Sequence, residues 1–550
     1  MRRLVLTTAV SLCLVANAVG ATTRAEIRDR VFTSAQRAQA SAAGQALAQA
    51  AGRIAAGSAD LQDLLRQQQD MSETIEAKRK ALADTASQSG AAAEAAIARL
   101  QSEIQDGRAQ LDALDAQLTR EFPEFRELTN PAPLSIAELQ VLLRPDEALV
   151  MTLTDETYLY TWAVSKTDSA WTRAEVNQSE TRDKVQALRT QLRVDTDNRA
   201  GLSLNQREKS IQPFDRSIAH ELYQTTLGPL EHVISGARHL MVVFDGPLTS
   251  LPPAVLLTAA PQGDDTSPQA LRNSDWLIKR HALTTLPTVS ALRALRQVSP
   301  PVDDTGTAPG FVGFGDPLLG YRLVAEAAPG DTGVVTRGIY EDVRKVADLA
   351  PLPNTARELR QLAATMGAGP ESVFLAESAT ESMVKSMDLS GAEVVAFATH
   401  GLLADGLPGL SEPALVFTPP ELPSAEDDAL LTASEAAQLE LSADLVILSA
   451  CDTAGSDGTP GAEGLSGLAR AFIYAGARAI LVSHWPVDDY AASVLTTGML
   501  DRMYAATPRS RAEALQHSTL DLLNDTSEDR FAHPRIWAPF VVVGEGGLDG

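Results

Sequence analysis

The chain has 550 residues, and 44% of them are hydrophobic, which is enough apolar material for a large core and about two to four domains. The formal net charge is −25, from 46 basic and 71 acidic residues. A chain this acidic binds nucleic acid and anionic membranes poorly, so we expect neither as a partner.

The N-terminus has the pattern of a secretory signal. Met1-Arg2-Arg3 is positively charged, Leu4 to Val15 is apolar, and small residues follow up to Ala21. We predict a signal peptide over residues 1–21 and an exported protein, periplasmic or extracellular, with an uncleaved N-terminal anchor as the alternative. The apolar run is too short to cross a bilayer. No later segment is longer and equally apolar, so we expect no membrane span in the mature chain.

Residues 22–130 have a helical composition. Ala, Gln, Leu, Arg and Glu dominate, and leucines recur at helical spacing, as in Leu111, Leu114 and Leu118. We predict two or three long helices in a hairpin, a coiled coil or a degenerate tetratricopeptide-like pair, because no convincing repeat of about 34 residues is present. The segment is either a module that binds a protein partner or a brace packed on the main domain.

A domain boundary is predicted at Asn130-Pro131-Ala132-Pro133, because two prolines so close together cannot continue a helix. We expect the helices before it to be separable. Strands and helices alternate beyond it, which predicts an α/β fold with a mainly parallel sheet covered on both faces. We divide this part into a small α/β connecting segment, 131–214, and a main domain, 215–545. The predicted strands are 148–153, 157–164, 240–244, 413–417, 444–450, 478–483 and 539–543, and the predicted helices are 353–366, 379–387, 464–475, 488–504 and 510–523.

One cysteine remains after the predicted signal peptide, and it follows an apolar run. Residues 443–450 lead to Cys451, and a similar run, 393–399, leads to His400, 51 residues earlier. The carboxyl ends of neighbouring parallel strands share an edge of the sheet, where ligands and substrates bind. Imidazole is the usual base that converts a thiol to a thiolate. Since exported proteins normally pair their cysteines, a lone thiol indicates a reactive group; the alternative is an ordinary buried cysteine.

Several motifs together resemble those of bacterial CHAT-domain proteins, a family of the caspase-like peptidase clan that also holds caspases and separase. They lie in residues 215–545, and the run 444–489 is the most specific. The motifs are Phe244-Asp245-Gly246-Pro247-Leu248, Leu251-Pro252-Pro253, Phe311-Val312-Gly313-Phe314-Gly315-Asp316-Pro317, Ala398-Thr399-His400-Gly401, Leu448-Ser449-Ala450-Cys451-Asp452-Thr453, Glu463 to Phe472, and Trp485-Pro486-Val487.

The resemblance implies a caspase-like αβα sandwich with His400 as base and Cys451 as nucleophile. A histidine about fifty residues before the cysteine is also the caspase arrangement. The backbone amides of Gly401 and Cys451 would form the oxyanion hole. Glycine suits that position, because without a Cβ it lets substrate approach the backbone closely.

Other residues compete for roles at this site. His484 also ends a predicted strand and is the rival base. Thr399 and nearby carbonyls are candidates to orient the imidazole, and no acidic third member is evident. For substrate binding, Asp245 ends a strand that we expect at the same edge, where a carboxylate would hold an arginine; its alternative role is turn formation. Asp452 is the second candidate for substrate binding.

The sequence predicts no metal and no cofactor. The histidines are scattered, and no second cysteine remains after the signal. Phosphate-binding loops are absent, and Gly313-Phe314-Gly315 is too short for a dinucleotide fingerprint.

The function predicted from the sequence is a secreted cysteine endopeptidase that uses a Cys-His dyad on protein or peptide substrates, with cleavage after a basic residue. The alternatives are a catalytically silent interaction or scaffold protein with the same fold, and a cysteine acyltransferase or amidase.

Overall fold

The computed structural model describes residues 24–38, 91–121, 132–193, 212–297, 310–319, 354–402, 412–421, 427–449 and 467–547, together with scattered positions between 64 and 85 and between 346 and 352, and residues 410 and 424. The predicted signal peptide, Cys451 and Asp452 lie outside the described residues.

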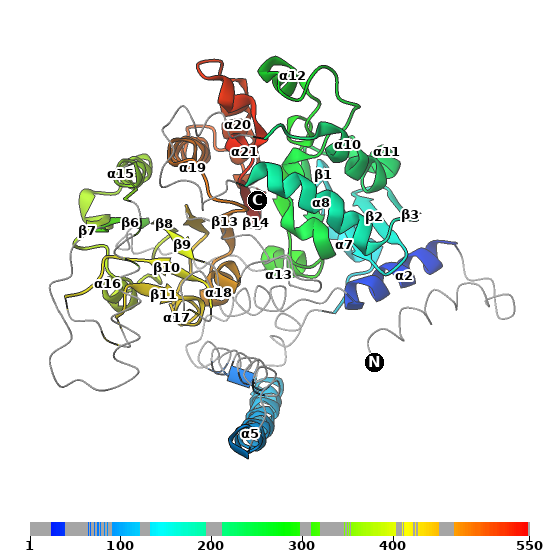
Figure 1. Ribbon diagram of the computed structural model, residues 1–550. Helices are drawn as coiled ribbons and strands as arrows, with labels where there is room; N and C mark the ends of the chain where they lie inside the picture. The colour runs from blue at the N-terminus through cyan, green and yellow to red at the C-terminus, as the bar shows by residue number, and fades with distance from the viewer. Residues whose placement is uncertain are drawn as a thin grey trace, which may run out of the picture.

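An 11-stranded sheet forms the centre of the molecule, in the order β3-β2-β1-β4-β5-β14-β13-β12-β8-β6-β7 (Figure 1). Seven of its ten neighbouring pairs are parallel. The strands are β1 (Glu147–Thr154), β2 (Leu159–Ser165), β3 (Ser169–Ala174), β4 (His239–Val243), β5 (Ala282–Thr285), β6 (Phe311–Pro317), β7 (Val373–Ala376), β8 (Val394–Ala398), β12 (Leu445–Leu448), β13 (Ala479–Ser483) and β14 (Phe540–Gly544). A second, three-stranded sheet contains β9 (Gly401–Leu402), β10 (Ala414–Val416) and β11 (Leu430–Thr432), in the order β11-β10-β9.

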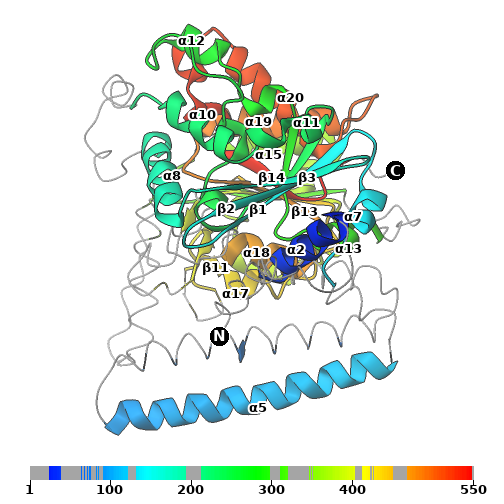
Figure 2. The same ribbon diagram turned by 90° about the vertical axis from the view of Figure 1, so that its right-hand side faces the viewer.

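Helices cover both faces of the large sheet (Figures 1 and 2). One face carries α8 (Gln178–Leu192), α10 (Arg216–Thr225), α11 (Glu231–Ile234), α12 (Pro268–Asn273), α15 (Thr355–Thr365), α19 (Asp489–Met503), α20 (Arg511–Asn524) and α21 (Pro534–Trp537). The other carries α2 (Arg24–Ala38), α7 (Ile136–Leu142), α13 (Ala291–Gln297), α16 (Glu381–Ser386), α17 (Ala433–Ala436) and α18 (Gly467–Ala475). Short 3-10 helices lie in the connections: η3 (Gly228–Leu230), η4 (Gly246–Ser250), η5 (Pro253–Val255), η6 (Leu277–Lys279), η7 (Pro370–Ser372) and η8 (Asp529–Ala532).

This arrangement confirms the predicted αβα sandwich with a mainly parallel sheet. Strands β4, β8, β12 and β13 are buried along their whole length, as expected for apolar strands covered on both faces. The helices that follow begin at side-chain caps, for example Asp488 before α19 and Ser510 before α20. The predicted strands and helices are present within a few residues of their predicted bounds, whereas strands β3, β5, β6, β7, β9 and β11 were not predicted.

The large sheet consists of two parts that run in opposite directions. Strand β13 is antiparallel to β14, and β14, β5, β4 and β1 are parallel to one another. On the other side of this junction β13, β12, β8, β6 and β7 are parallel. The carboxyl ends of β8 and β12 therefore lie at one edge of the sheet, and the carboxyl end of β4 lies at the opposite edge.

The connecting segment predicted at 131–214 shares the sheet of the main domain. Strand β1 pairs with β4 over five residue pairs, from Glu147↔His239 to Met151↔Val243. Residues on both sides of position 215 therefore contribute to one hydrophobic core, and the predicted boundary there is not a structural division.

The first helix, α2, is also part of the α/β body. Phe32 is fully buried and lies against Trp162 of β2, with 6.4 Å between the ring centroids. The side-chain amide of Gln36 donates to the carbonyl of Leu134 at 2.8 Å and accepts from its N–H at 2.9 Å. The prediction that the whole helical segment is separable was wrong for α2, because an alanine-rich composition does not show which helix buries an aromatic side chain in a distant core.

The long helix α5 (Ala91–Glu121) belongs to a different unit. It packs against helical residues between positions 64 and 85, since Lys78 pairs with Glu103 at 2.5 Å and Ile75 and Ile104 are buried. Gly107 allows this close packing, because a Cβ there would lie 3.0 Å from Ile75. These contacts are those of the predicted antiparallel hairpin, and Figure 2 shows α5 apart from the sheet and its covering helices.

Two deletions should separate the roles of α2 and of this hairpin. Because Gln36 already touches Leu134, a short Gly/Ser linker in place of residues 39–131 should leave the melting temperature within about 3 °C of the parent chain. Deletion of residues 22–131 also exposes the surface that Phe32 covers, so we expect a clearly lower melting temperature. Scanning fluorimetry measures both variants, and equal melting temperatures would contradict the integral role of α2.

Candidate functional site

Strands β8 and β12 are parallel neighbours, as the sequence predicted. Their register pairs Val394 with Leu445 and Phe397 with Leu448, and the N–H of Ser449 donates to the carbonyl of Phe397 at 2.9 Å. The register offset is therefore 51 residues, which is also the number of residues that separate Cys451 from His400. His400 follows β8 by two residues and is half-buried at the carboxyl edge.

One face of these two strands packs under α15 and α19. Val394, Ala396 and Ala398 of β8 and Leu445 and Ile447 of β12 belong to the core cluster on that side. Successive strand side chains alternate between faces, so the even positions of β8 and the odd positions of β12 share this side.

The segment after His400 turns into the small sheet. The carbonyl of His400 accepts from the N–H of Val416 at 3.0 Å, and Gly401 is paired with Leu415. In an antiparallel ladder the residue next to a hydrogen-bonded pair directs its N–H away from the partner strand. The N–H of Gly401 therefore points away from β10.

Thr399 joins the end of β8 to β10. Its side chain is buried, and its hydroxyl donates to the carbonyl of Val416 at 2.5 Å. A role of Thr399 in orienting His400 stays a prediction.

The rival base, His484, follows β13 but is enclosed. Its side chain is 5% exposed and lies beside Trp485, with ring centroids 6.4 Å apart. The pKa of His484 is lowered to about 3, mainly by burial and also by the charge of Arg189, while a hydrogen bond with the backbone of Ser250 opposes this shift. The Nδ1 atom has no hydrogen-bond partner in the structure. A neutral imidazole sealed from solvent is poorly suited to exchange protons with a substrate.

His484 should make the protein sensitive to acid. Its pKa is lowered in the folded state, so its stabilising contribution is complete above pH 6.5 and is lost as the pH falls toward 3. Between neutral pH and pH 3, the free energy of unfolding should therefore fall on the order of 4 kcal/mol less in His484→Phe than in the parent protein. Urea unfolding at a series of pH values measures this difference, with the exposed His232→Gln as control. Equal slopes in parent and His484→Phe would contradict the assignment.

Asp245 does not lie at the edge of the sheet that holds His400. It follows β4, which runs opposite to β8, so the predicted substrate-binding role at a shared edge was wrong. Its carboxylate accepts from the N–H of Thr154 at 3.1 Å, and its own N–H donates to the hydroxyl of Thr152 at 3.0 Å. Burial raises the pKa of Asp245, while backbone hydrogen bonds from Thr154 and Gly246 oppose this effect. It closes the turn after β4.

The other histidines make structural contacts or lie at the surface. The rings of His220, His281 and His533 each bond a backbone carbonyl, of Leu257, Ala237 and Gln212 respectively. Within the described part of the chain, no three His, Cys, Asp or Glu side chains are grouped so that they would hold a metal. Likewise, the described helices include none that is long and apolar enough to cross a membrane.

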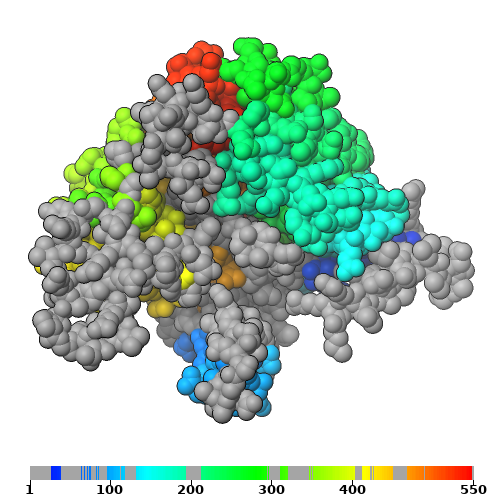
Figure 3. All heavy atoms as spheres, viewed as in Figure 1, coloured from blue at the N-terminus to red at the C-terminus, as the bar shows by residue number. Residues whose placement is uncertain are grey.

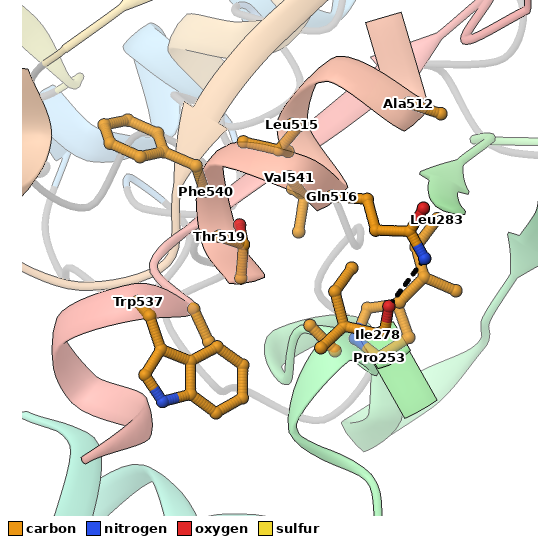
Figure 4. Close-up of a pocket in the computed structure, with 12 residues that line it drawn as sticks. Pro253, Ile278, Leu283, Ala512, Leu515, Gln516, Thr519, Trp537, Phe540 and Val541 are labelled. Atoms are coloured by element: carbon orange, nitrogen blue, oxygen red, sulfur yellow. Dashed lines mark hydrogen bonds between the residues drawn. The ribbon is translucent and has the colours of Figure 1, made fainter. Parts of the chain in front are cut away.

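Two pockets lie away from His400. The first, of about 20 Å³, is enclosed between α20 and the strands β5 and β14, where Gln516 bonds the carbonyl of Ile278 at 2.7 Å (Figure 4). That volume holds about one water molecule. A second, open pocket of about 440 Å³ lies near η8 and is lined by Asp265, Glu528, Arg530 and His533, among others. Neither pocket is lined by a residue of β8 or β12. Figure 3 shows α20 (red) beside α12 (green) at the top of the molecule.

One buried acid near the site was missed from the sequence. Glu358 lies in α15 and is completely buried, on the same helical face as Leu362 and Thr355. The sequence indicated Glu358 only by its spacing. It lies three residues after Thr355 and four before Leu362, so a charged residue falls on the helical face that the apolar residues occupy.

The described residues form an αβα sandwich with a mainly parallel sheet and place a half-buried histidine after a central strand. Residues 216–545, more than half of the chain, match the model of the CHAT domain, and the chain therefore belongs to the CHAT domain family.

Similar proteins include the human and mouse tetratricopeptide repeat protein 28, each 26% identical over 62% of this chain. The chain spans only 13% and 14% of these two relatives. Among solved structures, two yeast separase–securin complexes from Saccharomyces cerevisiae align over 83% of this chain and 34% of theirs, with TM-scores of 0.40 and 0.42 and identities of 11% and 10%.

Proposed function

We propose that this protein is a cysteine endopeptidase in which Cys451 is the nucleophile and His400 is the base. The observation that carries the proposal is the register of β8 and β12. It offsets the two strands by 51 residues, the same number that separates Cys451 from His400 in the sequence. Membership of a family in the caspase-like peptidase clan supports the same assignment.

The proposed reaction is acyl transfer to the thiol. His400 takes the proton of Cys451, and the thiolate attacks the carbonyl carbon of the scissile peptide. The protonated imidazole then gives its proton to the leaving amine, and water hydrolyses the thioester in a second step with His400 again as base. The chemistry requires only that the two side chains lie within hydrogen-bond reach.

Backbone donors would stabilise the tetrahedral intermediate. The N–H of Gly401 points away from β10 and is proposed as one donor, with the N–H of Cys451 as the other. One such donor contributes roughly a factor of 10² to 10³ in rate in enzymes where it has been removed.

The substrate is proposed to be a protein cut after a basic residue. Asp245 lies at the other edge of the sheet, so the proposed acid for that preference is Asp452, the neighbour of Cys451 in sequence. We further propose that the protein is exported from a bacterial cell, since residues 1–21 have the pattern of a signal peptide.

Capture by a peptide-based electrophilic probe tests the enzyme assignment. The full chain is treated with an acyloxymethyl ketone that carries arginine, and labelled peptides are identified by mass spectrometry. We expect covalent labelling at Cys451, and Cys451→Ala should give none. An arginine probe that labels no better than its aspartate counterpart would reject the basic preference alone. Failure of every probe to label Cys451 would favour a catalytically silent interaction protein.

That second function has one structural observation in its favour. Helix α5 lies apart from the α/β body in Figure 2, and among the described residues of the hairpin the buried apolar side chains are those of Ile75 and Ile104. A protein partner for the N-terminal helices is thus proposed as well, and it is compatible with either function.

A further inference from the structure

Glu358 is a buried carboxylate on the side of the sheet that α15 covers. Its exposure is 0%, and the residues around it on the helix, Leu359, Leu362 and Ala363, belong to the apolar core. Burial of an ionisable group is unfavourable unless hydrogen bonds compensate for the lost hydration. The position of Glu358 therefore depends on specific partners.

Two glycines let α15 approach the sheet closely enough for this contact. A Cβ at Gly313 of β6 would lie 3.0 Å from Leu359, and one at Gly315 would lie 2.8 Å from it. Strand β6 is the neighbour of β8, and Figure 1 shows α15 and α19 together on the same side of these strands. The Gly-x-Gly pattern of β6 thus serves close helix packing.

The carboxylate joins three elements. Its Oε1 accepts from the hydroxyl of Thr496 in α19 at 2.6 Å. Its Oε2 lies 3.5 Å from the hydroxyl of Ser449, which follows β12 directly. Ser449 is also bonded through its N–H to Phe397 of β8 and lies two residues before Cys451. Glu358 is therefore linked to the last described residue before the proposed nucleophile.

We propose that Glu358 is a positioning residue that, together with Thr496, holds the end of β12 so that the Cys451 thiol faces His400. This inference rests on the proposed function. A shift of about 1 Å in a reacting group costs a factor on the order of 10² in rate. The tether acts on the thiol through Ser449 and the backbone, and Glu358 need not touch the substrate.

The pH dependence of thiol alkylation tests this role without a known substrate. Iodoacetamide reacts with the thiolate, so its rate at Cys451 reports the pKa of that thiol; the labelled peptide is followed by mass spectrometry in the full chain. In the parent protein the rate should rise at a pH well below the ordinary thiol pKa of about 8.5. Glu358→Gln and Ser449→Ala should move the rise toward 8.5 and slow alkylation at pH 7 by about 10-fold.

Matched variants separate positioning from general stability. Thr497→Ala removes a buried hydroxyl of the same helix that bonds only the carbonyl of Ser493, so it should leave the profile unchanged. Thr496→Ala should shift the profile, and Thr496→Ser, which keeps the hydroxyl, should restore it. If Glu358→Gln does not fold, the alkylation profiles of Ser449→Ala and Thr496→Ala test the role of Glu358 in its place.

The outcomes distinguish the two proposals. A parent protein whose Cys451 reacts only as an ordinary thiol would overturn the proposed function and the tether with it. A parent with an activated thiol, but with folded Glu358→Gln, Ser449→Ala and Thr496→Ala variants that keep its profile, would overturn the role of Glu358 alone.

Discussion

Replacement His400→Ala is expected to slow acylation of Cys451 by about 10² to 10⁴, because a thiol that loses its base is mostly protonated at neutral pH. His400 follows β8 and is half-buried at the edge of the sheet, and its separation from Cys451 in sequence equals the register offset of β8 and β12. Second-order rates of capture by the arginine probe measure the loss directly, and cleavage of a matching fluorogenic peptide measures turnover. Cys451→Ala should abolish both signals while the melting temperature stays close to that of the parent.

His484 provides the comparison for this experiment. It ends the next strand, β13, but its ring is enclosed beside Trp485. His484→Phe should keep capture within about threefold of the parent at neutral pH. The opposite result would identify His484 as the base and contradict the proposed pairing. In that case His484→Phe would slow capture by about 10² to 10⁴, and His400→Ala would capture the probe as fast as the parent.

The second large effect is expected on stability. Arg296 of α13 forms a bidentate ion pair with Glu147 of β1, with both N–O distances at 2.7 Å, and its Nε lies 3.3 Å from Glu545. The two carboxylates are 2% and 3% exposed. Arg296→Ala would leave two buried negative charges without their main partner, which typically costs about 3–5 kcal/mol.

The pH dependence of this cluster has a definite sign. Burial alone would raise the pKa of Glu147, but hydrogen bonds from His239 and Arg296, together with the charge of Arg296, hold it well below its ordinary value of 4.5. The contribution of Glu147 is therefore present above about pH 4.5 and is lost as the pH falls through the lowered pKa. Arg296→Ala should remove most of this contribution.

Arg293→Ala is the matched control for Arg296→Ala. It removes an arginine from the same helix whose partner, Glu138, is 54% exposed. Such a surface pair contributes about 0–1 kcal/mol. Urea unfolding followed by tryptophan fluorescence compares the two variants. Similar losses of unfolding free energy would show that the buried cluster is not specifically stabilising.

The amino-acid sequence by itself determined where the principal strands lie and which residues end them. Apolar runs before His400 and Cys451 predicted β8 and β12, because a strand covered on both faces must be apolar at nearly every position. Their separation of 51 residues agreed with the observed register. The proline pair at 131 and 133 indicated the end of the helical segment, since proline cannot continue a helix.

Only the tertiary structure decided strand direction and long-range packing. Hydrophobicity reports burial, and burial is the same whichever way a strand runs, so the sequence did not show that β4 opposes β8 and takes Asp245 to the other edge. Phe32 packs against Trp162, which lies 130 positions later in the sequence. Glu358 contacts Thr496 and Ser449, which lie 138 and 91 positions later. Local composition carries no information about such partners, because these contacts form only when the sheet brings its covering helices together.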